Sequence, residues 1–266
     1  MEKIIVKREI EGVKNIVVVA SGKGGVGKST VSATLATSLA LQGYSVGLLD
    51  ADIYGPSLPL LFDIQHEQPE IKEIEGNTVI EPLVRLGVKL MSLGMFISPG
   101  EGALWRGPLA ANGMKQMIDQ TAWGELDILI IDTPPGTGDI HISLLQEYKI
   151  SGVIMVTTPQ MLSIGDVEKA MSLYNNKDVG VPILGVIENM SWFTPEKHPT
   201  EKYFLFGKGG GTALAKKFGV ELLSQIPLSE ELCNECDYGK LLHAIELPQI
   251  KGSFLEVVEK IQKALF

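Results

Sequence analysis

Cysteines, positive charges and long apolar runs are all scarce in this sequence, and each shortage excludes a class of protein. The 266 residues include two cysteines, too few for a disulfide scaffold and suited to a reducing compartment. Acidic residues outnumber basic ones by 32 to 23, and the net charge of −9 excludes a broad basic face for nucleic acid. There is no run of about eighteen apolar residues that could span a membrane. We therefore expect neither a nucleic-acid nor a membrane partner.

The first residues also lack a targeting pattern. Met1 to Glu9 have no long apolar core of the signal-peptide kind, so we expect a cytoplasmic protein. With 45% hydrophobic residues the chain can bury a large core, and we expect one P-loop ATPase domain over residues 1–266. A hairpin at about 65–84, around Glu75-Gly76-Asn77, and a mobile loop at about 194–203 are expected as insertions.

Strand-like and helix-like segments alternate along the chain. This alternation predicts an α/β fold, with a mostly parallel sheet and helices on both of its faces. The expected strands are 15–21, 45–49, 88–93, 127–131, 152–157, 181–188 and 221–226, and the expected helices are 30–41, 108–122, 163–174, 212–218 and 249–265.

A glycine-rich segment joins the first expected strand to the first helix and matches the phosphate-loop pattern G-x-x-x-x-G-K-[ST]. At such a junction, free backbone N–H groups and the helix dipole both face an anion. Lys28 adds a positive charge, and the Ser29 hydroxyl can bind Mg²⁺. The pattern predicts a nucleotide site formed by Gly22, Gly24, Gly25, Val26, Gly27, Lys28, Ser29 and Thr30.

Polar residues follow three other expected strands, at the sheet edge where such folds bind ligands. Asp132 ends an apolar strand. In phosphoryl-transfer enzymes an acidic residue at such a position holds Mg²⁺. Alternatively, Asp132 could cap the helix that follows. Asp52 is a better candidate than Asp132 for positioning the attacking water, and it is also expected to bind Mg²⁺ together with Ser29 and Asp132. Asp50 is expected to be structural. Asn189 is the candidate base contact. Gly136, after two prolines, is expected to offer its N–H to the γ-phosphate from a switch loop.

The phosphate loop contains a second lysine, Lys23, and the pattern Lys-Gly-Gly-Val-Gly-Lys resembles the deviant Walker A ATPases. These include MinD, ParA, the nitrogenase iron protein and the Mrp (ApbC-type) ATPases. The resemblance implies an ATP-dependent homodimer in which Lys23 reaches the partner's nucleotide and, with Asp52 and Lys28, takes part in hydrolysis. The other reading makes Lys23 a solvated loop cation.

Further motifs narrow the resemblance to the Mrp ATPases and cover nearly the whole chain. They are Asp50 to Ser57, Trp105 to Pro108, Asp132 to Asp139, Val156 to Gln160, Glu188 to Ser191 and Phe206 to Gly210. The resemblance implies an ATP- and Mg²⁺-dependent carrier that delivers iron–sulfur clusters to client apo-proteins. The role of Arg106 does not follow from it.

One position departs from that family. Members usually have Cys-x-x-Cys where this chain has Thr194-Pro195-Glu196-Lys197, which cannot bind iron as thiolates do. Cys233 and Cys236 have the same spacing, and two copies of the chain could supply four thiolates to a bridging [4Fe-4S] cluster, or bind zinc. Alternatively, they are a pair of small, half-buried residues.

Two other functions remain open. A positioning ATPase like MinD or ParA would need a membrane helix or a basic face. The C-terminal apolar stripe, which includes Phe254 and Val258, carries charges of both signs on its polar side, so we expect it to pack against the core. An ATP-driven adaptor or chaperone without a cluster is the other alternative, and the missing Cys-x-x-Cys favours it.

Overall fold

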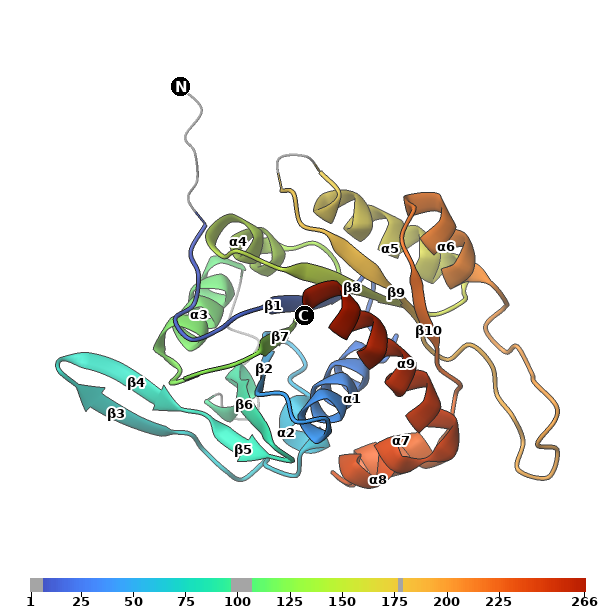
Figure 1. The fold of residues 1–266 in the computed structure, drawn as a ribbon, viewed down its shortest axis with the longest axis horizontal. Coiled ribbons are helices and arrows are strands. Elements are labelled where there is room, and N and C mark those ends of the chain that lie inside the picture. Colours follow the sequence, from blue (N-terminus) through green and yellow to red (C-terminus); the bar gives the residue numbers. More distant parts are fainter. Residues whose placement is uncertain (1–6, 97–106, 177–178) are drawn as a thin grey trace.

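An eight-stranded sheet forms the centre of the molecule in the computed structural model, which describes residues 7–96, 107–176 and 179–266 (Figure 1). Its strand order is β10-β9-β8-β1-β7-β2-β6-β5, and each neighbouring pair is parallel except β5 with β6. The strands are β1 (Ile16–Ser21), β2 (Val46–Asp50), β5 (Leu83–Arg85), β6 (Val88–Ser92), β7 (Ile128–Asp132), β8 (Gly152–Thr157), β9 (Ile183–Glu188) and β10 (Leu222–Gln225). The predicted α/β class and parallel sheet are confirmed.

Helices cover both faces of this sheet because its central strands are apolar on both sides. Val18 and Ala20 of β1 share a core with α3 (Gly107–Gln120), α4 (Asp139–Glu147), α5 (Met161–Tyr174) and α6 (Gly210–Phe218). Val17 and Val19 face the opposite core, with α1 (Lys28–Leu41), α2 (Leu58–Leu61), α8 (Leu241–Glu246) and α9 (Pro248–Leu265). The alternation along β1 thus divides the chain into two buried layers.

The C-terminal helix α9 belongs to the second layer. Its stripe of Phe254, Val257, Val258 and Ile261 is buried, and the helix packs on α1. The prediction that this stripe packs against the core is confirmed. Among the helices built from the described residues, none is long and apolar enough to cross a lipid bilayer.

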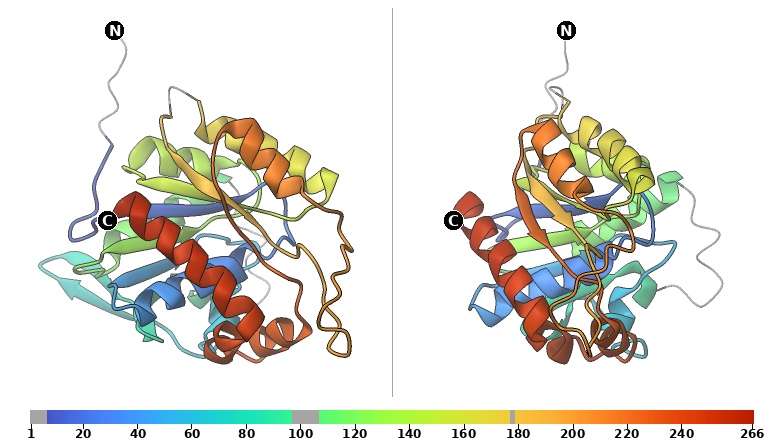
Figure 2. Two further views of the ribbon diagram at one scale, coloured as in Figure 1. Left: turned by 45° about the vertical axis from the view of Figure 1, so that its right-hand side comes forward. Right: turned by 90° about the vertical axis from the view of Figure 1, so that its right-hand side faces the viewer.

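The predicted hairpin is also present and lies outside the main sheet. Strands β3 (Glu70–Ile74) and β4 (Asn77–Glu81) pair antiparallel, with Glu75 and Gly76 at positive φ in the turn (Figure 1). The segment at 194–203 extends from the sheet beside α7 (Glu230–Asp237) (Figure 2). It carries no helix or ladder strand, apart from a bridge between Phe193 and Tyr203.

Several short elements were not predicted. They are α2, α4, α7, α8, the edge strand β5 and the 3-10 turn η1 (Leu93–Met95). Helix α1 begins at Lys28, two residues before the predicted start, and α5 begins at Met161. The missed helices have between four and nine residues, too few for a clear helical period in the sequence. The two shifted helix starts differ from the predicted ones by two residues each, as is common at helix ends.

Candidate functional site

The phosphate loop connects β1 to α1 and depends on its glycines. Gly25 and Gly27 both have φ of 80°, a left-handed conformation that favours glycine. Gly22 needs glycine for another reason, since a Cβ there would lie 2.2 Å from the backbone nitrogen of Val167 on α5. The loop is therefore shaped by backbone conformation and by the close approach of α5.

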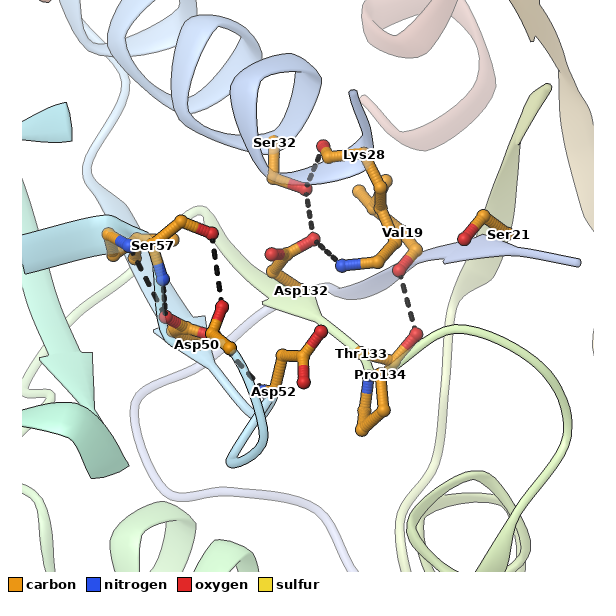
Figure 3. Close-up of polar contacts among 12 residues, drawn as sticks. Val19, Ser21, Lys28, Ser32, Asp50, Asp52, Ser57, Asp132, Thr133 and Pro134 are labelled. Carbon is orange, nitrogen blue, oxygen red and sulfur yellow. Dashed lines mark hydrogen bonds and ion pairs between the residues drawn. The ribbon is translucent and has the colours of Figure 1, made fainter. Parts of the chain in front are cut away.

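Lys28 and Asp132 form a buried ion pair at the centre of the site (Figure 3). Lys28 Nζ lies 2.8 Å from Asp132 Oδ1, and the Ser32 hydroxyl donates to the same oxygen at 2.7 Å. The register of the sheet sets this geometry, because Asp132 pairs with Val19 of β1 on one side and with Asp50 of β2 on the other. An uncompensated charge here would be costly, so each partner holds the other in place.

Two carboxylate oxygens beside this pair have no hydrogen-bond partner within the described residues. They are Asp132 Oδ2 and Asp52 Oδ1, and both atoms are buried. Buried acceptors in folded proteins are usually paired with a protein group, an ordered water or an ion. Mg²⁺ prefers oxygen ligands, and the Ser29 hydroxyl at the start of α1 adds a third oxygen to the set. The predicted Mg²⁺ ligands Ser29, Asp52 and Asp132 therefore fit the ion chemically.

Asp50 shapes the loop that carries Asp52. Its Oδ1 accepts from the Asp52 N–H at 3.0 Å, and its Oδ2 accepts from the Ser57 N–H at 3.1 Å and the Ser92 hydroxyl at 3.2 Å. Burial, and then the charge of Asp132, raise the pKa of Asp50 to about 7. Burial also raises the pKa of Asp52, which makes that carboxylate a better proton acceptor. These contacts agree with the expected structural role of Asp50.

The segment after Asp132 returns to β1 rather than pointing freely into the site. Thr133 Oγ1 donates to the Val19 carbonyl at 2.9 Å, and the Gly136 N–H donates to the Ser21 carbonyl at 2.8 Å. The Gly136 N–H, predicted to bind the γ-phosphate, is thus already bonded in this conformation. It can reach a phosphate only if this bond to Ser21 is exchanged, and its role remains a prediction.

His141 of α4 lies buried under this segment. One ring nitrogen lies 2.9 Å from the Pro134 carbonyl oxygen and the other 2.7 Å from the Tyr174 hydroxyl of α5. Burial lowers the pKa of His141 to about 4, so the ring is neutral near pH 7. This neutral ring links the Asp132–Gly136 segment to α5. The helix that carries His141 could have been predicted from Ile140 and Leu144, an apolar pair at helical spacing.

A cavity of about 440 Å³ extends from the phosphate loop to α7. Asn189 lines it between the two ends and donates through Nδ2 to the Val26 carbonyl at 2.8 Å, which leaves Oδ1 as an acceptor. Pro227, Leu228 and Leu232 form the apolar far wall. A planar base fits this end, and the amide oxygen of Asn189 suits the exocyclic amino group of adenine.

Cys233 and Cys236 line the same cavity from α7, one turn apart. Cys233 is exposed, whereas Cys236 is buried against the apolar core. Burial raises the pKa of Cys236 to about 11, so its thiol stays protonated near neutral pH. In the described part of the chain, no group of three or more His, Cys, Asp or Glu side chains could hold a metal ion. Metal binding at these cysteines remains a prediction.

Lys23 lines the nucleotide cavity, and its ammonium group contacts a side chain outside the phosphate loop. Its Nζ lies 3.3 Å from Gln160 Oε1, in the segment just before α5. The loop's second lysine is thus held by a weak contact that a stronger acceptor can replace. Arg106 and Trp105, part of another predicted motif, lie outside the described residues.

Comparison with known proteins identifies the family. The model described as "ParA: NUBPL iron-transfer P-loop NTPase" matches residues 12–262. The chain belongs to this family. An iron-sulfur cluster carrier protein of Aquifex aeolicus is 39% identical over 99% of the chain and 71% of its own length. The iron-sulfur cluster transfer protein NUBPL of Dictyostelium discoideum is 39% identical over 98% of the chain and 80% of its length.

Solved structures agree with this assignment. A nucleotide-binding protein of Archaeoglobus fulgidus, in complex with ADP, has a TM-score of 0.76 and 36% identity, covering 92% of this chain and 93% of that one. The cell division ATPase MinD of Pyrococcus furiosus has a TM-score of 0.66 at 20% identity, covering 94% and 99% of the two chains, and supports the fold alone. The predicted deviant Walker A fold and Mrp-type family are confirmed.

Proposed function

We propose that this protein is a cytoplasmic, Mg²⁺-dependent ATPase that acts as a homodimer and carries iron–sulfur clusters to client apo-proteins. The observation that carries the proposal is the pair of unpartnered carboxylate oxygens, on Asp52 and Asp132, beside the phosphate-loop Lys28. A structural ion pair would need only the Lys28 contact. Relatives named as iron–sulfur cluster carriers supply the cargo in this proposal.

The hydrolytic step follows from these residues. The phosphate-loop N–H groups and Lys28 bind the phosphates of ATP, as the dipole of α1 favours. Ser29 and Asp132 would hold Mg²⁺, with Asp52 close to it, and the bound ion would supply positive charge beside the phosphates. Asp52 orients the attacking water through its free Oδ1. Asn189 is the proposed base contact, with its Oδ1 free to accept from the exocyclic amino group of adenine, the base that the resemblance to the Mrp ATPases favours.

The homodimer rests on Lys23. Within one chain its Nζ contacts Gln160 and not the phosphate cavity's lysine, Lys28, or its carboxylates. ATP bound by a second copy offers Lys23 a stronger acceptor, because an anionic phosphate attracts the ammonium group more strongly than the neutral amide oxygen of Gln160 does. In this proposal each copy thus completes the partner's site, and dimerisation requires ATP.

The cluster is the cargo, and Cys233 and Cys236 are its proposed ligands. A bridging [4Fe-4S] cluster needs four thiolates, and Cys233 and Cys236 from two copies supply that number. Cys236 must then leave its buried position and lose its proton, against a pKa of about 11. Metal binding drives such deprotonation in other proteins, so binding of the cluster can offset this cost.

Anaerobic reconstitution tests the cargo. The protein is incubated with iron and sulfide, desalted, and analysed for iron content and visible absorption. We expect about one cluster per dimer, as four thiolates per cluster require. Cys233→Ser and Cys236→Ser should each abolish the absorption and leave ATP binding intact. Equal iron in the double variant and the wild type would assign the two cysteines to structure.

A second candidate function is an ATP-driven adaptor that binds a client protein without a cluster. The observation that favours it is Thr194 to Lys197, which provides no thiolate where relatives of the resembled family have two. Wild-type protein that binds ATP but no iron would favour this function over the carrier.

A further inference from the structure

A second cavity, of about 680 Å³, lies on the far side of the nucleotide cavity's wall. We call it the Trp192 groove, lined by Trp192, Phe193, Pro195, Glu196, Glu230 and Glu231 among others. One side is the segment after β9, and the other is the N-terminal turn of α7. Figure 2 shows this segment extending away from the sheet next to α7.

Backbone hydrogen bonds fix the walls of this groove. The Leu228 N–H donates to the Trp192 carbonyl at 2.7 Å, and Phe193 and Tyr203 exchange two N–H···O bonds of 2.8 Å each. The Ser229 hydroxyl caps α7 by accepting from the Leu232 N–H at 3.2 Å. The groove is therefore a built surface, with its aromatic wall held by main-chain contacts to both neighbouring segments.

The charged side chains that line the groove are acidic, and one cation of the same chain, Lys202, lies over the Trp192 ring. The lining includes three glutamates and no lysine, arginine or histidine. Glu231 accepts from Gln249 Nε2 at 3.1 Å, while Glu196 and Glu230 take part in no ion pair among the described residues. The dipole of α7 adds about half a positive charge at this end, which the three carboxylates outweigh. A cationic partner thus meets unpaired carboxylates.

The aromatic wall also accommodates a cation. Lys202 of the same chain places its Nζ 3.6 Å from the centre of the Trp192 ring. Such a contact is favourable because the ring face is electron-rich. Trp192, Phe193 and the prolines also offer apolar surface to the aliphatic part of a long side chain. The groove therefore offers carboxylates and apolar surface to a lysine or arginine side chain, which would take the Trp192 ring face only by displacing Lys202.

We propose that the Trp192 groove docks a basic, extended segment of the client protein, whose lysine or arginine side chains face Glu196 and Glu230. The inference rests on the proposed carrier or adaptor function, for which it names the recognition surface. Charge complementarity argues for this occupant, since a nucleic acid or an acidic segment would be repelled.

The groove shares three residues with the nucleotide cavity, namely Pro227, Leu228 and Ser229. Asn189, which contacts the phosphate loop through Val26, is two residues before Ser191, whose N–H donates to the Ile226 carbonyl at 2.9 Å. A base bound against Leu228 therefore touches the back of the groove. We expect nucleotide and client to change each other's affinity by the same factor.

The test uses a labelled peptide of alternating lysine and leucine, with binding followed by fluorescence anisotropy. The full-length double variant Glu196→Gln/Glu230→Gln should bind it about fivefold more weakly, as expected for two exposed charge pairs. The matched control Glu73→Gln/Glu259→Gln removes the same charge from exposed sites elsewhere and should change the affinity less than about twofold. A peptide with serine in place of leucine should bind more weakly to wild type.

Three results would overturn the proposal. They are no binding of the peptide to wild type, equal losses in the two double variants, and equal binding of a peptide with glutamate in place of lysine. A dissociation constant unaffected by a non-hydrolysable ATP analogue would overturn the coupling. ATP binding by Glu196→Gln/Glu230→Gln is measured alongside, so failure of the groove and failure of the nucleotide site are distinguished.

Discussion

The two ends of the nucleotide cavity are built differently, although one continuous surface lines both. At the phosphate end, Lys28 and Asp132 are almost fully buried, and their contacts are charged and short. At the α7 end, the lining is apolar apart from Ser229, two thiols and an exposed aspartate, and the pKa of Cys236 is raised rather than lowered.

This difference separates binding of the nucleotide from handling of the cargo. The phosphate end has its charges in place before any ligand arrives, so binding requires little reorganisation there. The α7 end offers a protonated, buried thiol, so a cluster there requires α7 to move and the thiol to ionise. Single charge changes at the phosphate end should therefore alter ATP binding or hydrolysis strongly. Single changes at the α7 end should alter ATP binding little.

The largest effects are expected for Asp52 and Lys23 at the phosphate end. Asp52→Ala should bind ATP, hydrolyse it about a hundredfold more slowly and accumulate the dimer, because the water is no longer oriented. Lys23→Ala should bind ATP but neither dimerise nor turn over. Sedimentation with ATP, combined with phosphate release, separates the two variants. Identical behaviour would contradict the division of roles between them.

Lys28→Ala should have the next largest effect, on ATP affinity. Loss of one charge-assisted contact costs about 1.5–3 kcal/mol, which is at least about tenfold in the dissociation constant. Titration with labelled ATP measures it, with Lys216→Ala, at an exposed lysine of α6, as the control. Unchanged affinity in a folded Lys28→Ala protein would remove the phosphate-loop assignment. GTP should bind more weakly than ATP to the wild type.

His141, which lies beneath the Asp132–Gly136 segment, should make the stability of the protein depend on pH. Its pKa is about 4 when folded against 6.5 as the ordinary value, so the unfolded chain binds the extra proton. The buried, neutral His141 ring therefore contributes to folding stability in full above pH 6.5, and this contribution is lost as the pH falls toward 4. Between pH 7 and pH 5, wild type should lose about 2 kcal/mol more stability than His141→Gln.

Urea unfolding at the two pH values makes this comparison. Asp50, whose pKa is raised to about 7, changes stability in the opposite direction over the same range. That contribution is common to wild type and His141→Gln and cancels in the difference between them. Parallel pH profiles for the two proteins would mean that His141 is not held neutral by burial.

The smallest effects are expected at the α7 end. Cys233→Ser and Cys236→Ser should each change ATP affinity by less than about twofold, since neither thiol meets a charged part of the nucleotide. Cys236→Ser should cost about 1 kcal/mol of stability, because it buries a hydroxyl in an apolar site. Labelled-ATP titration and thermal melting measure the two effects. A tenfold loss of ATP affinity in either variant would erase the contrast between the ends.

The sequence predicts the phosphate end well because its signals are local. A glycine pattern between an apolar strand and a helix specifies both backbone and chemistry, and the aspartates at strand ends meet because parallel strands end at one edge. The unpartnered oxygens of Asp52 and Asp132 agree with the predicted Mg²⁺ ligands, which remain a prediction.

Contacts between distant segments could not be predicted. Gln160 as the partner of Lys23, the Tyr174–His141–Pro134 link and the Gly136 bond to Ser21 each join residues from different elements. Their geometry depends on how α4 and α5 pack, which no periodicity specifies. The short helices α2, α7 and α8 were missed because tertiary packing, not intrinsic propensity, stabilises helices of one or two turns.

The central claim is that ATP turnover drives delivery of a cluster, and transfer from the reconstituted protein to an apo-ferredoxin tests it most directly. The rate of cluster appearance on the acceptor is measured with ATP and Mg²⁺, with ADP, and without nucleotide, for wild type and Asp52→Ala. The account predicts that ATP accelerates transfer by wild type and not by Asp52→Ala. Equal rates under all conditions, or an ATP effect that survives in Asp52→Ala, would contradict it.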